Sequence, residues 1–208
     1  MKHLIKKMMI CGASFLVSAT ALAQRDQKFS FSLNYNVAVP LSEGFKDYVS
    51  KTSFRGFQGA ILYKLNDQFR FGLQASFNDF YEKFGRQVYK TADGADISAV
   101  LSNTLQSLPV LVKGEYSFSK SGAIKPFVGL GAGINFVNFD QYYGEFQYSK
   151  YSTKAAFSGD LGVLIPFSKT SNYGAKISTS YNLTPFNEEG IKNIDTWNVQ
   201  AGIVVPLK

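Results

Sequence analysis

The sequence predicts an all-β fold, an eight-stranded antiparallel up-and-down transmembrane β-barrel, and three observations predict it. Apolar and polar residues alternate along eight segments of nine to thirteen residues. Strands that cross a membrane need about 9–11 residues, whereas strands of soluble proteins average about five or six. The links between the segments are alternately short and long. The polar faces carry mostly small residues, with few charges.

The first segment, Lys28–Val39, shows the alternation most clearly. Phe29, Leu33 and Tyr35 share a wholly apolar face, and Asn34 and Asn36 lie on the other face, because successive side chains of a strand point to opposite sides. Seven further segments repeat the pattern: Phe57–Leu65, Phe69–Tyr81, Leu108–Phe118, Val128–Phe136, Ala155–Ile165, Ala175–Leu183 and Trp197–Leu207.

The connections indicate which ends of the strands lie together. Short turns are expected at Asn66-Asp67, Ser119–Lys125 and Ser168–Tyr173, and longer links at Pro40–Ser53, Lys83–Leu105, Asp140–Lys154 and Thr184–Thr196. Outer-membrane barrels have short periplasmic turns and long extracellular loops. A count of ten strands stays open, since Lys83–Leu105 is long enough to contain a further hairpin.

Apolar and polar residues also alternate along the strands of a soluble β-sandwich or a lipocalin-like barrel, which are the competing folds. The length of the strands and the Gly, Ser, Ala and Asn on their polar faces favour the crowded interior of an eight-stranded membrane barrel. Aromatic residues gather near both ends of the strands, as expected for two interfacial girdles. Those near the short turns are Tyr63, Phe69, Phe71, Tyr116 and Phe118, and those near the long links are Tyr81, Phe136, Tyr181 and Trp197.

The N-terminus reads as a cleaved export signal over Met1–Ala23, which leaves Gln24–Lys208 as the barrel domain. A basic start is followed by an apolar run and by the small-residue site Ala21-Leu22-Ala23. The only cysteine, Cys11, and the only histidine, His3, both lie in this signal. The mature chain would therefore have no thiolate metal site and no His-dependent catalysis, and we expect neither an enzyme nor a cofactor.

The net charge of +7 includes three lysines of the signal, so the mature balance is +4. No run of basic residues follows, and we expect no nucleic-acid partner. Six charged residues face the expected barrel interior: Lys64, Arg70, Lys113, Glu115, Asp160 and Lys176. Buried charges must pair, which favours a structural ion-pair network; a gated polar path and a catalytic carboxylate–lysine site are the alternatives.

Aromatic residues crowd the long link after Asp140. Tyr142, Tyr143, Phe146, Tyr148 and Tyr151 are candidates for extracellular contacts. They could instead pack across the barrel mouth or lie at the level of lipopolysaccharide. Six cations on the same side are candidates for pairing with lipopolysaccharide phosphates: Lys46, Lys51, Arg55, Lys83, Arg86 and Lys90.

The run Gly129, Gly131 and Gly133 lacks the spacing of a dinucleotide-binding loop and no helix follows it. We expect these glycines to make room for large side chains in the interior. The surrounding stretch Leu108–Phe136 resembles the central hairpin of the small OmpA/OmpX/OmpW-like outer-membrane β-barrel domains, in which a Pro-aromatic-x-G-x-G-x-G strand follows a short turn. The chain departs from many of them by ending on Leu207-Lys208 and not on an aromatic residue.

The resemblance implies a bacterial outer-membrane barrel with a structural or loop-mediated interaction role. The alternative is a narrow channel for small solutes, favoured by the interior candidates Leu62, Leu111, Phe127 and Val204. The expected partners are outer-membrane lipid, lipopolysaccharide and the barrel assembly machinery, with the protein itself a monomer.

Overall fold

The computed structural model describes residues 28–90, 96–119, 122–144, 146–167, 173–188 and 191–207. The predicted export signal lies outside these residues. The elements follow one another as β1 (Phe29–Pro40), α2 (Glu43–Tyr48), β2 (Ser53–Lys64), β3 (Phe69–Lys90), β4 (Asp96–Ser117), β5 (Lys125–Tyr143), β6 (Phe146–Pro166), β7 (Gly174–Glu188) and β8 (Ile191–Leu207).

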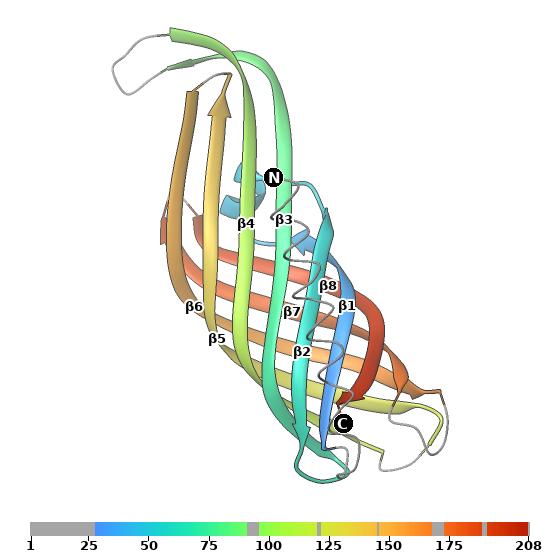
Figure 1. The fold of residues 1–208 in the computed structure, drawn as a ribbon. Helices are drawn as coiled ribbons and strands as arrows, with labels where there is room; N and C mark the ends of the chain where they lie inside the picture. Colours follow the sequence, from blue (N-terminus) through green and yellow to red (C-terminus); the bar gives the residue numbers. More distant parts are fainter. Residues whose placement is uncertain are drawn as a thin grey trace, which may run out of the picture.

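The eight strands form one closed antiparallel barrel in which each strand pairs with the next along the chain (Figure 1). The barrel closes where β1 pairs with β8, from Phe29↔Leu207 to Pro40↔Thr196. Closure leaves no unpaired edge in the ring, which a lipid environment requires. The prediction of eight strands is confirmed.

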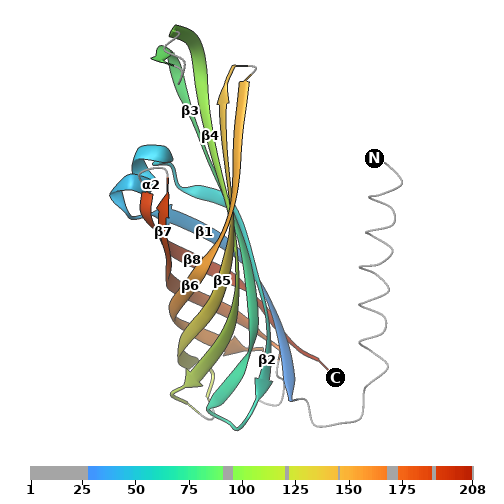
Figure 2. The same cartoon turned by 90° about the vertical axis from the view of Figure 1, so that its left-hand side faces the viewer.

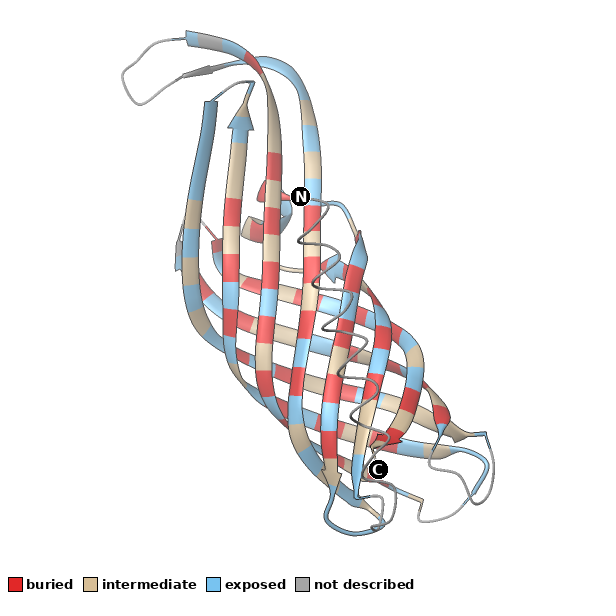
Figure 3. Cartoon of the chain, in the orientation of Figure 1, coloured by how far each residue is buried: buried red, intermediate tan, exposed pale blue. Residues whose placement is uncertain are grey.

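Burial along the strands is inverted relative to a soluble protein. Tyr35 is 53% exposed, whereas its neighbour Asn36 is fully buried. The alternation recurs around the ring (Figure 3), with exposed Phe, Leu, Ile and Val outside and buried Ser, Asn and Gln inside. An apolar exterior over a polar interior is stable only when lipid surrounds the barrel, and this excludes the soluble sandwich.

The turn between β2 and β3 lies where the sequence predicts it. Asn66 accepts hydrogen bonds at Oδ1 from the backbone N–H groups of Gln68 (2.9 Å) and Phe69 (2.8 Å). Asparagine side chains commonly stabilise tight turns in this way. This side of the barrel is called the short-turn end below.

The expected long links at the opposite end are largely strand, which corrects the sequence-based boundaries. β3 and β4 pair as far as Lys90↔Asp96, and β5 and β6 as far as Tyr143↔Phe146. β7 and β8 likewise continue to Glu188↔Ile191. Residues 83–90 and 96–105 are therefore the far parts of β3 and β4 and add no strands to the ring. The alternation of outward apolar and inward polar residues is absent there, because these residues do not face lipid.

The four central strands rise beyond the rest of the barrel (Figure 2). β3 to β6 have 19–22 residues, whereas β1 and β2 have 12, β7 has 15 and β8 has 17. The projecting part is called the wall and comprises residues 78–90, 96–107, 137–143 and 146–156. β2 pairs with β3 only as far as Phe57↔Phe77, and β7 with β6 only as far as Phe157↔Leu183.

The link between β1 and β2 contains α2, the single helix in the described part of the chain. Within the same residues, no helix combines the length and the apolar character needed to cross a membrane.

Candidate functional site

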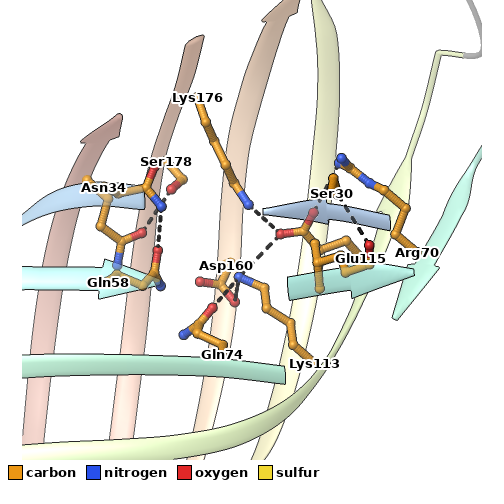
Figure 4. A network of polar contacts seen from close by, with 12 residues as sticks. Ser30, Asn34, Gln58, Arg70, Gln74, Lys113, Glu115, Asp160, Lys176 and Ser178 are labelled. Carbon is orange, nitrogen blue, oxygen red and sulfur yellow. Dashed lines mark hydrogen bonds and ion pairs between the residues drawn. The ribbon is translucent and has the colours of Figure 1, made fainter. Parts of the chain in front are cut away.

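Five of the six predicted interior charges meet in one cluster, called the charge network (Figure 4). Glu115 lies at its centre, with Oε1 2.5 Å from Lys176 Nζ and 3.3 Å from Lys113 Nζ. Its other oxygen, Oε2, lies 3.0 Å from Arg70 Nη2. Lys113 Nζ also lies 3.1 Å from Asp160 Oδ2. Three cations thus share two carboxylates from β4 and β6.

The network is almost completely buried, and its cations have further partners. Lys113 donates to Gln74 Oε1 at 2.7 Å, and Lys176 lies 4.5 Å from the centre of the Phe127 ring. A buried charge is tolerated only when such contacts replace the water it has lost. The ion-pair interpretation of the sequence therefore has a geometric basis.

Lys64 does not join this network. Its Nζ lies 2.7 Å from Asp67 Oδ1 in the short turn, and both side chains are substantially exposed. The alternation places Lys64 correctly on the inner face of β2, but it is the last residue of that strand, so its side chain reaches solvent at the mouth.

The interior glycines make room for the network. A Cβ on Gly129 would lie 3.1 Å from Lys113 Cε and 3.3 Å from Asp160 Oδ2. A Cβ on Gly162 would lie 2.6 Å from Phe127 Cζ, the ring on which Lys176 rests. The contacts at Gly129 thus support the steric explanation for this position of the glycine run.

A layer of amides and hydroxyls lies further along the interior, away from the short turns. Asn34 donates to Gln58 Oε1 at 3.0 Å, and Asn135 donates to Thr184 Oγ1 at 3.0 Å. Gln200 donates to Ser180 Oγ at 2.9 Å. The four apolar candidates Leu62, Leu111, Phe127 and Val204 are also buried inside. A cavity beside Asn78 and Asn135 has a volume of only about 10 Å³, so side chains nearly fill this part of the lumen.

An apolar cluster, called the plug, closes the lumen beyond this layer. It joins residues of the helical segment to inward-facing residues of six strands: Ala38, Phe45, Tyr48, Val49, Phe80, Leu105, Val137, Phe139, Phe186, Ile191 and Ile194. Phe45 packs edge-to-face on Phe80, and Tyr48 packs edge-to-face on Phe139. Phe139 in turn stacks on Phe186 at 5.0 Å between ring centres.

Hydrogen bonds hold α2 over the mouth. Tyr48 donates its hydroxyl to the Asp140 carbonyl at 3.0 Å, and Asn103 Nδ2 donates to the Tyr48 carbonyl at 2.8 Å. Ser50 donates its backbone N–H to Glu82 Oε2 at 2.6 Å. At the start of the helix, Ser42 Oγ donates to the Asn193 carbonyl of β8 at 2.6 Å. Hydrogen bonds thus fix one end of α2 to β8 and the other end to the wall.

Sequence reasoning missed the plug, although a signal for it exists. On β5, the inward positions change from Gly133 and Asn135 to Val137 and Phe139, while the outward positions change from Phe136 to Asn138 and Asp140. The apolar face therefore changes sides within one strand. The same exchange occurs on β4 between Ser107-Leu108 and Leu105-Gln106.

The five aromatic contact candidates lie on strands of the wall and not on loops, which corrects their predicted setting. Tyr142 and Tyr143 end β5, and Phe146, Tyr148 and Tyr151 belong to β6. Tyr151 is the most open of them at 79% exposed, and Phe146 and Tyr148 are also exposed. Tyr142 accepts a hydrogen bond from Gln147 Nε2 at 3.1 Å, so this ring is held against the hairpin.

The aromatic residues near the short turns form contacts on the outer surface. Tyr63 packs edge-to-face on Phe71, and Tyr116 contacts both Phe69 and Phe118. Near the other boundary, Tyr81, Phe136, Tyr181 and Trp197 are all exposed. This distribution is that of two interfacial girdles.

Comparison with known proteins agrees with this geometry. Residues 9–204 match the family model described as the outer membrane protein beta-barrel domain. Neisserial surface protein A has a similar structure, with 16% identity, a TM-score of 0.58, and coverage of 86% of this chain and 97% of that one. Ail, the attachment invasion locus protein of Yersinia pestis, has 16% identity, a TM-score of 0.49, and coverage of 85% and 97%.

At such identities the likeness concerns the fold alone. A search of curated protein sequences found no significant match. The family match spans nearly the whole chain and agrees with the closed eight-stranded ring and its apolar exterior. The chain belongs to the outer membrane protein beta-barrel domain family.

Proposed function

We propose that this protein is a closed outer-membrane scaffold that presents the wall to binding partners outside the cell. The observation that carries the proposal is the wall itself, a four-stranded sheet that rises beyond the barrel on one side (Figure 2). Outer-membrane barrels generally have short turns in the periplasm and longer connections outside, which supports an extracellular position for the wall.

The wall offers two kinds of contact. Residues 146–156 of β6 form an edge of the wall that extends beyond the β6–β7 pairing, which ends at Phe157↔Leu183. Such edges can accept an additional strand from another polypeptide. Tyr151, Phe146 and Tyr148 lie along the same edge, and exposed aromatic side chains provide large contact areas at low entropic cost.

The filled lumen supports a structural rather than a transporting role. The charge network and the plug obstruct the interior at two levels. No enzymatic activity is proposed, because the chain outside the predicted signal contains neither histidine nor cysteine and the network carboxylates are paired.

Lipopolysaccharide is a second expected contact. Arg55 lies near the upper girdle, with Nη2 3.3 Å from Asp79 Oδ2 and its guanidinium 5.7 Å from the Tyr81 ring centre. Lys46 lies in the last turn of α2, Lys51 follows the helix, and Lys83 lies on the wall. Phosphates of lipopolysaccharide at this level would neutralise the exposed cations.

The interaction role can be tested by photo-crosslinking on intact cells. A benzophenone amino acid replaces Tyr151 or Tyr148 in one set of variants. Leu65 in the short turn serves as the matched control, because its exposed fraction of 62% lies between those of the two tyrosines. We expect discrete adducts of one common mass at Tyr148 and Tyr151 and none of that mass at Leu65. Folded variants that give no adducts at the wall would contradict the proposal.

The alternative function is a narrow channel, which the many polar groups of the interior favour. This function requires both the plug and the charge network to move, since Phe45 and Phe139 are buried across the mouth. In planar bilayers we expect both the native barrel and Phe45→Ser to be silent, because the charge network still obstructs the lumen behind an opened plug. Steady conductance of the native protein would favour the channel over the closed scaffold.

A further inference from the structure

The mouth of the lumen at the short-turn end contains a second cavity, distinct from the wall and the plug. It has a volume of about 90 Å³, which is room for several water molecules. Lys64, Arg70 and Lys125 line it from the inner faces of β2, β3 and β5, and Lys28 lines it from the start of β1. Asn66 and Asp67 border it from the turn.

The charge of this cavity is strongly unbalanced. Four of its lining residues are cationic, and one, Asp67, is anionic. Asp67 pairs with Lys64 at 2.7 Å, and Arg70 is paired with Glu115 deeper in the lumen at 3.0 Å. In the described part of the chain, no carboxylate forms an ion pair with Lys28 or Lys125.

The network behind the cavity does not offset this imbalance. Apart from Arg70, which also lines the cavity, its cations Lys113 and Lys176 balance the two carboxylates, so the positive excess remains at the cavity. Positive potentials add within a concave wall of low dielectric, which concentrates anions at the opening. A neutral or cationic ligand would gain nothing from this arrangement.

The turn supplies a directional donor. Both backbone hydrogen bonds that fix Asn66 use its Oδ1, at 2.9 and 2.8 Å. The amide orientation is thereby set, so the two N–H donors of Nδ2 are not used to hold the turn, and Asn66 lines the cavity. Two ammonium groups and an amide donor are the groups that bind tetrahedral oxyanions.

We propose that this vestibule binds the phosphate group of a periplasmic compound through Lys28, Lys125 and Asn66, with Lys64 and Arg70 adding to the positive potential. The volume admits one such group and excludes a nucleic acid chain. The lining side chains lie on the inner faces of the strands, so the site opens at the end of the lumen. The phosphate belongs to a soluble compound or to the headgroup of an inner-leaflet lipid that folds over the rim.

Calorimetric titration of the full barrel in phosphatidylcholine nanodiscs tests the site, with inorganic phosphate as the probe at low ionic strength. We expect saturable binding of one phosphate per barrel that weakens as salt is added. The double variant Lys28→Gln/Lys125→Gln is expected to bind about tenfold more weakly, since two favourable ion pairs are lost. Lys150→Gln/Lys192→Gln removes the same charge at the opposite end, from residues assigned to no phosphate contact, and should bind like the native protein.

Three results would overturn the proposal: no saturable binding, equal binding by Lys28→Gln/Lys125→Gln, or equal weakening by both double variants. Circular dichroism confirms that each variant is folded before titration. A second arm repeats the titration in nanodiscs that contain phosphatidylglycerol. Competition by that lipid identifies the headgroup as a source of the phosphate, and unchanged affinity identifies a soluble compound; both support the site. Adduct formation at the wall is independent of all these results.

Discussion

The charge network and the plug obstruct the same lumen with opposite chemistry. Around the network, lipid covers the outer face of the strands, so the outward positions must be apolar and the inward positions carry polar and charged groups that pair with one another. Around the plug, the outward positions are Asn138, Asp140 and Gln106, and the inward ones are Phe139, Val137 and Leu105. The protein thus changes to soluble-type packing where it leaves the membrane.

This difference shows where the membrane ends. The apolar face changes sides between Phe136 and Asn138 on β5 and between Leu108 and Gln106 on β4. The outward aromatic residues Tyr81, Tyr181 and Trp197 lie near the same boundary. Hydrophobic burial stabilises the plug because water surrounds this part of the chain, whereas within the membrane the apolar exterior is already satisfied by lipid.

The largest effect is expected at the centre of the network. Glu115→Gln leaves Arg70, Lys113 and Lys176 buried with one carboxylate, Asp160, between them. Removing one partner of a buried ion pair costs about 3–5 kcal/mol of unfolding free energy. Urea unfolding in lipid vesicles, followed by the fluorescence of the single tryptophan, Trp197, measures this loss.

Asp67→Asn is the matched control, because it also neutralises one carboxylate but in an exposed pair with Lys64. We expect it to change the unfolding free energy by less than about 1 kcal/mol. Equal losses in the two variants would mean that the network contributes no more than a surface ion pair.

A somewhat smaller loss is expected in the plug. Phe139 is 2% exposed and contacts both Tyr48 and Phe186. Phe139→Ala should lower the unfolding free energy by about 3 kcal/mol, from lost burial and the cavity that remains. The same urea experiment measures it. Tyr151→Ala, on an exposed position of the same hairpin, should cost less than about 0.5 kcal/mol. If Phe139→Ala left the unfolding free energy unchanged, the plug would be only loosely packed.

The smallest effect is expected for alanine substitutions at two glycines that lie on opposite faces of the barrel sheet. Gly129→Ala places a methyl group 3.1 Å from Lys113 Cε, and the paired lysine cannot move without weakening its contacts. Nothing lies within 4 Å of a Cβ on Gly114, which faces outward. We expect a loss of about 1 kcal/mol for Gly129→Ala and a neutral or slightly stabilising effect for Gly114→Ala. The reverse order of the two midpoints of urea unfolding would contradict the steric role of Gly129.

The inward direction of five charged side chains follows from a local pattern. Arg70, Lys113, Glu115, Asp160 and Lys176 each interrupt an otherwise small or uncharged inner face, so the period of two identifies their direction without knowledge of their neighbours. Lys64 has the same alternation and also points inward, but it is the last residue of its strand. The alternation alone does not indicate how deeply a side chain is buried in the lumen. The partners of Glu115 come from β3, β4 and β7, and these distances depend on the register between strands.

The sequence by itself indicated the membrane barrel, the short turn at Asn66-Asp67 and the side of each strand that faces lipid, and it favoured eight strands while ten stayed open. These properties follow from alternation, which is a property of consecutive residues. Only the tertiary structure decided that the expected long loops form a wall and that a helix closes the mouth with apolar residues from six strands. Both depend on contacts between residues distant in the chain, such as Phe45 with Phe80 and Phe139 with Phe186. The positions of those partners are set by strand register and closure of the ring, which no local pattern encodes.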